Sequence, residues 1–278
     1  MGSCISSAGT GGTPESSPAC PATDIPRRVT TYSMNDQLSP PVSAARVAEV
    51  YLRYFAGRPE YSGVALPGLL PHDACGVYGT YHRPGRVKVL FIAESPPWTA
   101  GRREVARPGD CLSPDYPYFW NDRYDVGRRR ARAPLSGGLA ENIFLMLGLD
   151  GESRRENLEL FAGKNFFLDD TIKCVFRKNR KAAIPNDLVR MSAREVLARE
   201  IAGLAPEYVV ALGKTALMGL RAIEPYASAL AGVGKITEIL PEDLFEEHHL
   251  LCVPYPGGRN RRYLDLIESG FEHIRDLV

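Results

Sequence analysis

The sequence predicts an α/β protein: a three-layer α/β/α domain around a mostly parallel central sheet of about four strands. Four short apolar runs, at residues 87–93, 165–173, 208–212 and 249–253, are typical of strands buried on both faces. Stretches with helical periodicity or helix-start residues lie between them, and strands that alternate with helices form parallel sheets through βαβ units. We therefore expect the carboxyl ends of the four strands to meet at one edge of the sheet.

The composition of the chain limits the class of protein, its partners and its cellular compartment only broadly. The chain has 278 residues, of which 44% are hydrophobic and 24% charged, so it can bury a sizeable core as ordinary globular proteins do. The net charge of +1 excludes no class of partner. Whether the chain can bind nucleic acid depends instead on whether its basic residues cluster. The six cysteines form no C-x-x-C pair, which argues against a zinc site or a disulfide framework. No apolar run approaches the roughly 18 residues of a membrane span, and the N-terminus lacks an apolar signal core, so we expect a cytoplasmic protein.

The chain begins with a leader of low complexity. Residues 1–41 are rich in Ser, Thr, Gly and Pro, and a segment with so few large apolar side chains cannot offset the entropy cost of ordering. We expect this leader to be disordered and the folded domain to span residues 42–278. Met34 offers an alternative start of translation.

The helices are expected from apolar spacing and from their end signals. Apolar residues recur at three- and four-residue intervals over residues 43–55, and Gly57 and Pro59 end that run. Further helices are predicted at residues 138–149, at 188–204 after a Pro-Asn-Asp start, after Gly213 up to Arg221, and at the C-terminus. Residues 99–134 form a long irregular stretch with an aromatic cluster, and such loops are usually functional or disordered. The aromatic cluster favours an ordered loop.

The first strand leads into a candidate site. Residues 87–98 read VKVLFIAESPPW, so an apolar strand stops at Glu94 and continues through Ser95 and two prolines to Trp98. Prolines cannot donate to a sheet and fix the backbone, so this loop should be stiff. Ligands bind at the carboxyl ends of strands in open α/β sheets. A carboxylate, a hydroxyl and an indole at this position therefore indicate a binding site.

Basic residues cluster at residues 128–132, 177–181 and 259–262. The last two clusters follow strand ends, so they should be neighbours in space. Together with the aromatic residues 118–120 they offer phosphate contacts beside stacking surfaces, the combination that binds single-stranded or flipped bases. The alternative is a set of solvated loops balanced by acidic helices. Leu212-Gly213-Lys214-Thr215 echoes a P-loop, but Tyr208 stands where its first glycine is required.

Four segments occur in an order that is similar to a known family. They read AESPP at residues 93–97, DTIKC at 170–174, LAREIAGLAPEYVVALG at 197–213 and YPG at 255–257. They resemble the G-E-A-P-G-like loop, the N-x-x-K-C strand end, the L-x-R-E-I scaffold segment and the H-P-S-like loop of the uracil-DNA glycosylase superfamily, especially its iron–sulfur branches. The resemblance covers roughly residues 87–260.

The resemblance implies a uracil-DNA glycosylase-like protein that binds DNA and excises a flipped, deaminated or damaged base by hydrolysis of its N-glycosidic bond. Glu94 would activate a water, and Tyr255 would help the base anion to leave. The implied base-binding residues are Ser95, Pro96, Phe119 as a stacking ring, Trp120, and Asp170 at the edge of the base. The implied DNA-phosphate contacts are Arg177, Lys178, Arg180, Arg259, Asn260 and Arg262. We expect a monomer with DNA as its partner, without a membrane partner and without a cofactor.

The departures from the family pattern affect the chemistry. Asp170 replaces the family's base-recognition Asn; an ionised carboxylate cannot donate to a uracil carbonyl, although it can accept from an exocyclic amine or act when protonated. Tyr255 replaces the family's His and carries no positive charge. Of the four cluster cysteines only Cys174 is matched, so we expect no iron–sulfur cluster and no other metal.

Two alternatives therefore stay open. One is a catalytically inactive nucleic-acid- or nucleotide-binding module on the same fold. The other is a small-molecule hydrolase that uses Glu94 and Asp170 as paired carboxylates.

Overall fold

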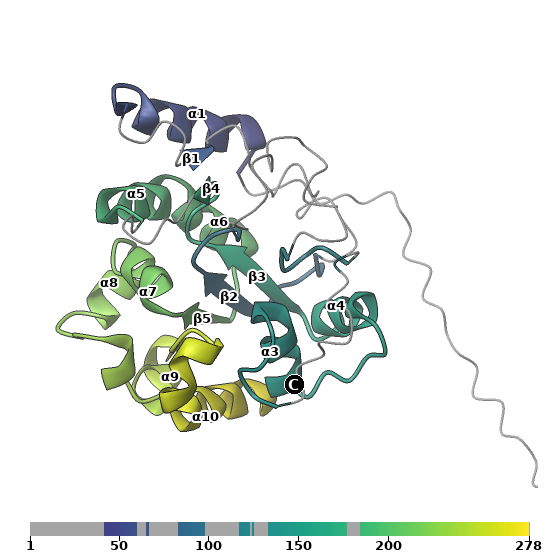
Figure 1. Cartoon of the computed structure of the whole chain (residues 1–278). Coiled ribbons are helices and arrows are strands. Elements are labelled where there is room, and N and C mark those ends of the chain that lie inside the picture. Colours follow the sequence, from purple (N-terminus) through teal and green to yellow (C-terminus); the bar gives the residue numbers. More distant parts are fainter. Residues whose placement is uncertain are drawn as a thin grey trace, which may run out of the picture. The chain divides into compact units, whose positions relative to one another are not determined.

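The computed structural model of the chain describes residues 42–59, 65–66, 83–97, 117–122, 124, 133–176 and 184–277 (Figure 1). All of them belong to one structural unit, Gln37–Val278. The predicted leader, Trp98 and the basic clusters at residues 128–132 and 177–181, which include Arg177, Lys178 and Arg180, lie outside the described residues. The predictions made for them remain predictions.

A four-stranded parallel sheet forms the centre of this unit, as predicted. Its strands β2 (Val89–Ala93), β3 (Phe166–Asp170), β5 (Tyr208–Leu212) and β6 (Leu250–Val253) lie in the order β3-β2-β5-β6. Ala93 pairs with Asp170, and Leu212 pairs with Val253. The strand ends therefore lie level with one another at one edge of the sheet.

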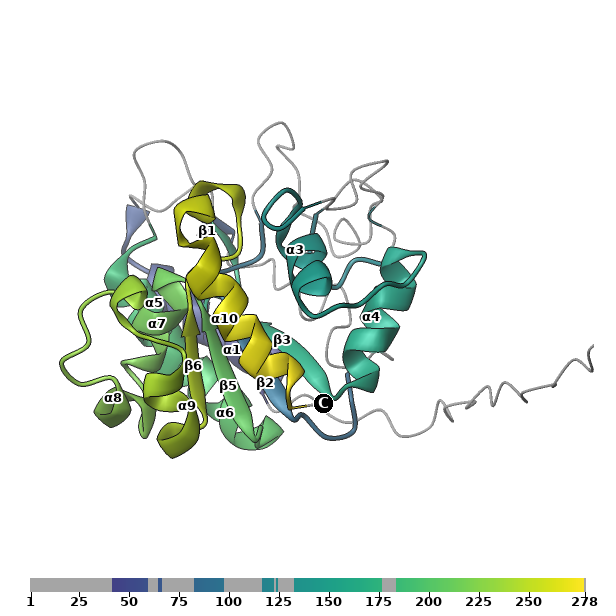
Figure 2. The same ribbon diagram turned by 90° about the horizontal axis from the view of Figure 1, so that it is seen from below.

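One face of the sheet is covered by α4 (Arg154–Gly163) and α10 (Leu264–Arg275), and Figure 2 shows α10 in front of the strands. Phe91 of β2 lies 5.5 Å from the ring of Phe161 in α4 and 6.3 Å from that of Phe271 in α10, centroid to centroid. Gly270 of α10 lies so close to β6 that a Cβ atom there would come within 2.7 Å of the Val253 side chain. Aromatic packing and one close helix approach thus fix this layer.

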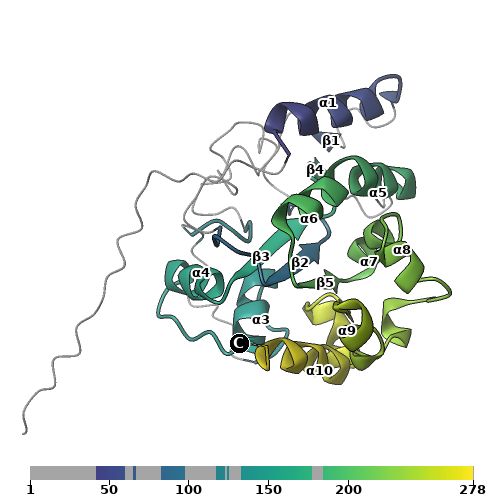
Figure 3. The same ribbon diagram turned by 180° about the vertical axis from the view of Figure 1, so that it is seen from behind.

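The opposite face is covered by a continuous helical stretch and by α7 (Lys214–Leu220). The stretch comprises α5 (Asn186–Ser192), a π-helical segment η3 (Ala193–Leu197) and α6 (Ala198–Leu204). Figure 3 shows α5 and α6 on the side of the strands away from α10. Gly219 of α7 packs against Thr171, where a Cβ atom would lie 2.6 Å from its methyl group. Helices on both faces of a parallel sheet confirm the predicted three-layer α/β/α architecture.

Helix α1 (Ala44–Phe55) begins where the sequence predicts, with the Ser43 hydroxyl accepting from the amide of Arg46. Its buried residues form a second apolar core with Ile172, Cys174 and residues of α5. A two-residue strand β1 (Ala65–Leu66) pairs with β4 (Val175–Phe176) in an antiparallel sheet. Helix α1 is thereby packed against the segment that follows β3.

Several elements differ from the sequence-based expectation. Strand β3 ends at Asp170 rather than at Lys173. Helix α4 was not predicted, although Ser153 and Glu156 form a capping box at its start. The other short elements are α3 (Leu139–Met146), α8 (Tyr226–Ala229), η4 (Ile236–Glu238), α9 (Glu242–His248) and η5 (Gly258–Tyr263). Among the helices described, none has the length and apolar character needed to cross a membrane.

Candidate active site

The ends of three strands bring the predicted site residues Glu94, Asp170 and Tyr255 to one edge of the sheet, and the fourth brings Thr215, which was not predicted. Glu94 follows β2, Asp170 ends β3, Thr215 follows β5 by three residues and Tyr255 follows β6 by two. The amide of Gly213 donates to the carbonyl of Val253 at 2.8 Å, which joins the exits of β5 and β6. Sequence positions that are far apart thus meet because the strands are parallel.

Glu94 is half-buried and held from two sides. The Thr215 hydroxyl donates to its Oε2 at 2.6 Å. The backbone of Glu94 is fixed because its carbonyl accepts from the amide of Ile172 at 2.9 Å, while the neighbouring Ala93 carbonyl accepts from the Thr171 amide and hydroxyl. In the loop that follows, Ser95 is half-buried and Pro96 is buried. The carboxylate therefore has a defined position at the rim.

Asp170 is a buried carboxyl group with an unused oxygen. Its side chain is 3% exposed, and Oδ2 has no hydrogen-bond partner among the described residues. Burial, and next the charge of Asp169, raise the pKa of Asp170 to about 8, while Lys173 acts in the opposite direction. At pH 7 the group is mostly protonated, so it offers both a hydroxyl donor and a carbonyl acceptor.

A buried ion cluster lies directly behind Asp170. The Nζ atom of Lys173 lies 2.5 Å from Oδ1 of Asp169 and 2.5 Å from Oε2 of Glu200 in α6. All three side chains are at most 1% exposed. Burial alone would lower the pKa of Lys173, but the two carboxylates outweigh it and the pKa is raised, so the lysine stays charged. The cluster ties β3 to α6 and fixes the backbone on both sides of Asp170.

Tyr51 of α1 adds a second anchor to this segment. Its hydroxyl accepts from the amide of Lys173 at 2.6 Å and lies 2.6 Å from Oγ of Ser192, which in turn donates to the carbonyl of Thr171. Burial raises the pKa of Tyr51 well above its ordinary value, so it stays neutral. The residues on either side of Asp170 are therefore held by hydrogen bonds as well as by charge.

Tyr255 stands at the exit of β6 with 38% of its surface exposed. Burial of part of the side chain, with the charges of Asp170 and Glu141, raises the pKa of Tyr255 to about 12. The phenol is thus neutral at pH 7 and can donate a hydrogen bond. Gly213 makes room for it, because a Cβ atom there would lie 3.0 Å from the Cβ of Tyr255, and its φ of +89° favours glycine.

The loop that carries Tyr255 is pinned from α3. The buried Asn142 donates from Nδ2 to the carbonyl of Pro256 at 2.8 Å, and Asn260 donates to the carbonyl of Tyr255 at 2.8 Å. Of the phosphate contacts predicted on this loop, Arg259 and Arg262 are exposed and Asn260 is half-buried. Two guanidinium groups thus face solvent close to Tyr255.

The predicted stacking residues are part of the aromatic core. Phe119 and Trp120 are 4% and 3% exposed. Phe119 lies between 5.0 and 5.6 Å, centroid to centroid, from the rings of Trp120, Phe144 and Phe161. Trp120 stacks on the ring of Phe167 in β3 and donates from Nε1 to the carbonyl of Leu168 at 3.0 Å. These contacts fix both rings, and their predicted contact with a base stays a prediction.

Comparison with known proteins assigns the chain to a family. The family model described as the uracil DNA glycosylase superfamily matches residues 81–277. The chain belongs to the uracil DNA glycosylase superfamily. Searches of the curated proteins and of the solved structures gave no match. Membership confirms the resemblance that the sequence motifs indicate and supports a glycosylase-like function in general.

Three residues of this superfamily member that hold the site were not expected to do so. Thr215 holds Glu94, Asn142 holds the loop of Tyr255, and Arg154 donates to the carbonyls of Tyr118 and Phe119 at 2.7 and 3.0 Å. Arg154 is itself paired with a carboxylate of α3, that of Glu141. Of these three roles, the sequence indicates only that of Asn142, which is a polar residue within the apolar stripe of its helix.

Cys174 is the residue that the resemblance matches to a cluster cysteine of the iron–sulfur branches. Its side chain is completely buried in the second apolar core, and burial raises the pKa of its thiol to about 12. Within the described ranges, no group of three His, Cys, Asp or Glu side chains is placed to hold a metal ion.

Proposed function

We propose that this superfamily member is a DNA glycosylase that hydrolyses the N-glycosidic bond of a deaminated or damaged base flipped into the strand-end site. The observation that carries the proposal is Asp170: a buried carboxyl group, next to Glu94 at the edge of the sheet, with one oxygen that has no hydrogen-bond partner among the described residues. A buried polar atom without a partner is costly, and its presence calls for an explanation such as a ligand. A base edge would supply the missing hydrogen bonds.

Protonated Asp170 can make the same pair of hydrogen bonds to a base as the side-chain amide of Asn. With a pKa of about 8 it is neutral at pH 7 and presents one O–H donor and one carbonyl acceptor. This pair complements a base edge that offers a carbonyl next to an N–H, as in uracil, hypoxanthine and xanthine. The replacement of the family's Asn by Asp170 is then compatible with deaminated bases.

Glu94 acts as the general base in this proposal. It accepts a proton from a water that attacks C1′ of the sugar, the C1′–N bond breaks, and the base leaves with the electron pair of that bond. The Thr215 hydroxyl donates to Oε2 of Glu94 at 2.6 Å and so fixes the position of the carboxylate at the end of β2. General base catalysis by a positioned carboxylate is worth about 10²- to 10⁴-fold in rate.

In this proposal Tyr255 stabilises the leaving base, and the exposed loop around it binds the DNA backbone. The neutral phenol donates to the developing negative charge on the base, with nearby backbone amides as further donors. Arg259, Asn260 and Arg262 on the same loop contact phosphates, together with Arg177, Lys178 and Arg180. Phe119, which is 4% exposed and packed against three aromatic rings, is the ring proposed to contact the flipped base.

A gel assay of base excision tests this function. Single- and double-stranded oligonucleotides with one uracil, hypoxanthine or xanthine are incubated with the protein, and abasic sites are cleaved with alkali. We expect cleavage at one or more of these bases and none in the undamaged strand. Glu94→Gln protein purified in the same way excludes a contaminating enzyme.

The alternatives predict other outcomes of the same experiment. Salt-sensitive DNA binding without cleavage at any lesion would contradict the glycosylase and support the inactive binding module. Absence of both binding and cleavage would contradict both of these functions.

A further inference from the structure

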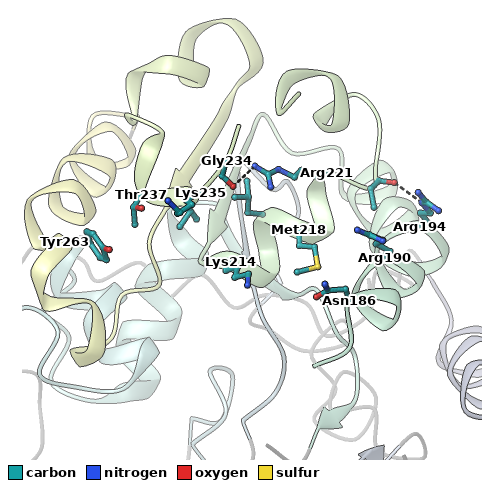
Figure 4. A pocket seen from close by; sticks show the side chains of 13 residues that line it. Asn186, Arg190, Arg194, Lys214, Met218, Arg221, Gly234, Lys235, Thr237 and Tyr263 are labelled. Atoms are coloured by element: carbon teal, nitrogen blue, oxygen red, sulfur yellow. Dashed lines mark hydrogen bonds between the residues drawn. The ribbon is translucent and has the colours of Figure 1, made fainter. Parts of the chain in front are cut away.

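A cavity of about 650 Å³ lies beside the candidate active site and is not part of it (Figure 4). It is formed by α5 and η3 on one side, by α7 in the middle, and by residues 234–237 and Tyr263 on the other. Figure 4 shows Arg190 and Arg194 at one end, Tyr263 at the other, and Met218 and Arg221 between them. Glu94, Asp170 and Tyr255 do not line it. Its volume is that of a small-molecule site.

The lining of the cavity carries charge of one sign. Among the described residues that line it there is no carboxylate. The cationic side chains are Arg190, Arg194, Lys214, Arg221 and Lys235. Since the whole chain has a net charge of only +1, this is a local concentration of positive charge. A cleft lined by charge of one sign concentrates ions of the opposite sign, here anions.

Two of these cations are held in place by groups that do not neutralise them. Arg194 donates from Nε to the carbonyl of Ala222 at 3.4 Å, and Arg221 donates from Nη2 to the carbonyls of Val233 and Gly234. Carbonyl oxygens carry only partial charge, so both guanidinium groups keep their positive charge. Within the described part of the chain, Lys235 alone of the five has an ion pair, with Glu238 at 2.7 Å.

The neighbouring carboxylates are engaged on the other side of the same helices. Glu195 of η3 pairs with Arg46 and Arg53 of α1 at 3.2 and 3.3 Å. Asp187 of α5 lies 3.9 Å from Arg58. These helices therefore direct their acidic groups toward α1 and their arginines toward the cavity.

The floor of the cavity is apolar. Leu217 and Met218 of α7 and Ile236 of η4 supply its apolar lining, here called the floor. Tyr263 lies at one end (Figure 4). A site with a cationic rim and an apolar floor suits a ligand that combines phosphate groups with a flat, weakly polar ring system. A nucleotide has this combination.

We propose that this cavity binds the phosphate groups of a nucleotide, with the base against the apolar floor. The nucleotide is either free, as a nucleoside polyphosphate, or one unit of a nucleic-acid strand. The site is separate from the proposed base-excision site, so the two can be tested independently.

Calorimetric titration of the full-length protein tests the proposal, with ATP, inorganic tripolyphosphate and an undamaged single-stranded oligonucleotide as probes at about 0.15 M salt. We expect saturable one-to-one binding of ATP that weakens as salt rises. Tripolyphosphate should bind more weakly than ATP because it lacks the base. Competition between ATP and the oligonucleotide indicates that the phosphates belong to a strand; binding of ATP without competition indicates a free nucleotide.

Charge reversal at the cavity shows whether binding occurs there. Arg190→Glu and Lys235→Glu change exposed side chains and should each weaken ATP binding about tenfold or more, since a charge-assisted hydrogen bond is worth at least about 1.4 kcal/mol. The matched control is Arg199→Glu, an exposed arginine of α6 outside the cavity, which should leave binding unchanged. No saturable binding of ATP or tripolyphosphate, or equal loss in the control, would overturn the proposal. Thermal melting of each variant confirms that it is folded.

Discussion

Asp170 and Glu94 lie at adjacent strand exits but have different surroundings. Asp170 is buried, and its Oδ2 has no partner within the described part of the chain, whereas Glu94 is half-buried and accepts a hydrogen bond from Thr215. Environments that separate the protonation states of two carboxyl groups are characteristic of acid–base sites. At the scale of single residues, we therefore assign recognition of the base to neutral Asp170 and activation of the water to Glu94.

Substitution of Glu94 by Gln should abolish turnover and spare DNA binding. The amide keeps the size of the side chain but cannot accept a proton, so we expect a single-turnover rate at least about 10²-fold lower. The rate is measured by alkaline cleavage and the affinity by fluorescence anisotropy. The control is Glu159→Gln, on the surface of α4. An unchanged rate in Glu94→Gln would remove Glu94 from the catalytic role.

Substitution of Asp170 by Asn should stabilise the protein at alkaline pH. The folded-state pKa of about 8 lies above the unfolded value, so the native state binds more protons than the unfolded chain between about pH 4 and pH 8. Stability is therefore lost as pH rises through this window, and Asn removes that loss. Each unit of pKa difference corresponds to about 1.4 kcal/mol, so the gain at pH 9 is on the order of a few kcal/mol.

Urea unfolding at pH 5 and pH 9 measures this effect. Asp187→Asn, on the exposed side of α5, is the control and should change stability little at either pH. An equal effect of Asp170→Asn at both pH values would contradict the raised pKa.

At the scale of elements, the geometry of the site depends on one hydrogen bond and one ion cluster that lie outside the strands. Asn142 of α3 holds the loop after β6, and the Lys173 cluster holds the segment after β3 to α6. Each connects groups that are far apart in sequence. Their loss should therefore affect site geometry and stability together.

Asn142→Ala should loosen the Tyr255 loop and reduce turnover. It leaves the carbonyl of Pro256 without its donor, at a cost of about 1–3 kcal/mol for a buried unsatisfied group. The control is Asn157→Ala, which removes hydrogen bonds to Gly151 at the start of α4 and should lower stability without changing turnover. The measurements are urea unfolding and the excision rate. Equal turnover in the two variants would show that Asn142 has no part in positioning Tyr255.

Lys173→Met should destabilise the protein by about 3–5 kcal/mol at pH 7, because it leaves Asp169 and Glu200 buried without a cation. The loss should shrink as pH falls below about 8, because burial, and next the charge of Asp169, raise the pKa of Glu200 to about 8, and a protonated carboxyl group no longer needs the cation. Denaturant unfolding against pH measures it. Lys235→Met, which breaks an exposed pair with Glu238, is the control and should have little effect. A loss independent of pH would indicate a packing defect instead.

At the scale of the whole molecule, the architecture could be predicted because the four strands are buried on both faces and read as apolar runs. Helix α4 could not, because only Leu158 and Phe161 of its ten residues are buried and its charges hide the pattern. Parallel strands made the meeting of Glu94, Asp170 and Tyr255 predictable.

The parts of the site that escaped prediction depend on long-range contacts. Asn142 bonds to a carbonyl 114 residues away, and no local pattern indicates such a bond. Thr215 appeared only in a failed P-loop motif, although it lies against Glu94. The hydrogen bonds from Arg154 to the carbonyl of Phe119 and from the Trp120 ring to the carbonyl of Leu168 also join residues far apart in sequence. The positive charge of the cavity beside the candidate active site likewise comes from helices whose packing the sequence alone does not show.

The pH dependence of the single-turnover excision rate on uracil-containing DNA tests the central claim most directly. Between pH 6 and 9.5, at constant ionic strength, the wild-type rate should fall as pH rises through about 8, because Asp170 ionises and loses its donor. Tyr255, with a pKa of about 12, stays neutral across this range. In Asp170→Asn the alkaline fall should disappear. A wild-type rate that does not fall, or the same fall in Asp170→Asn, would contradict a neutral Asp170 as the reader of the base.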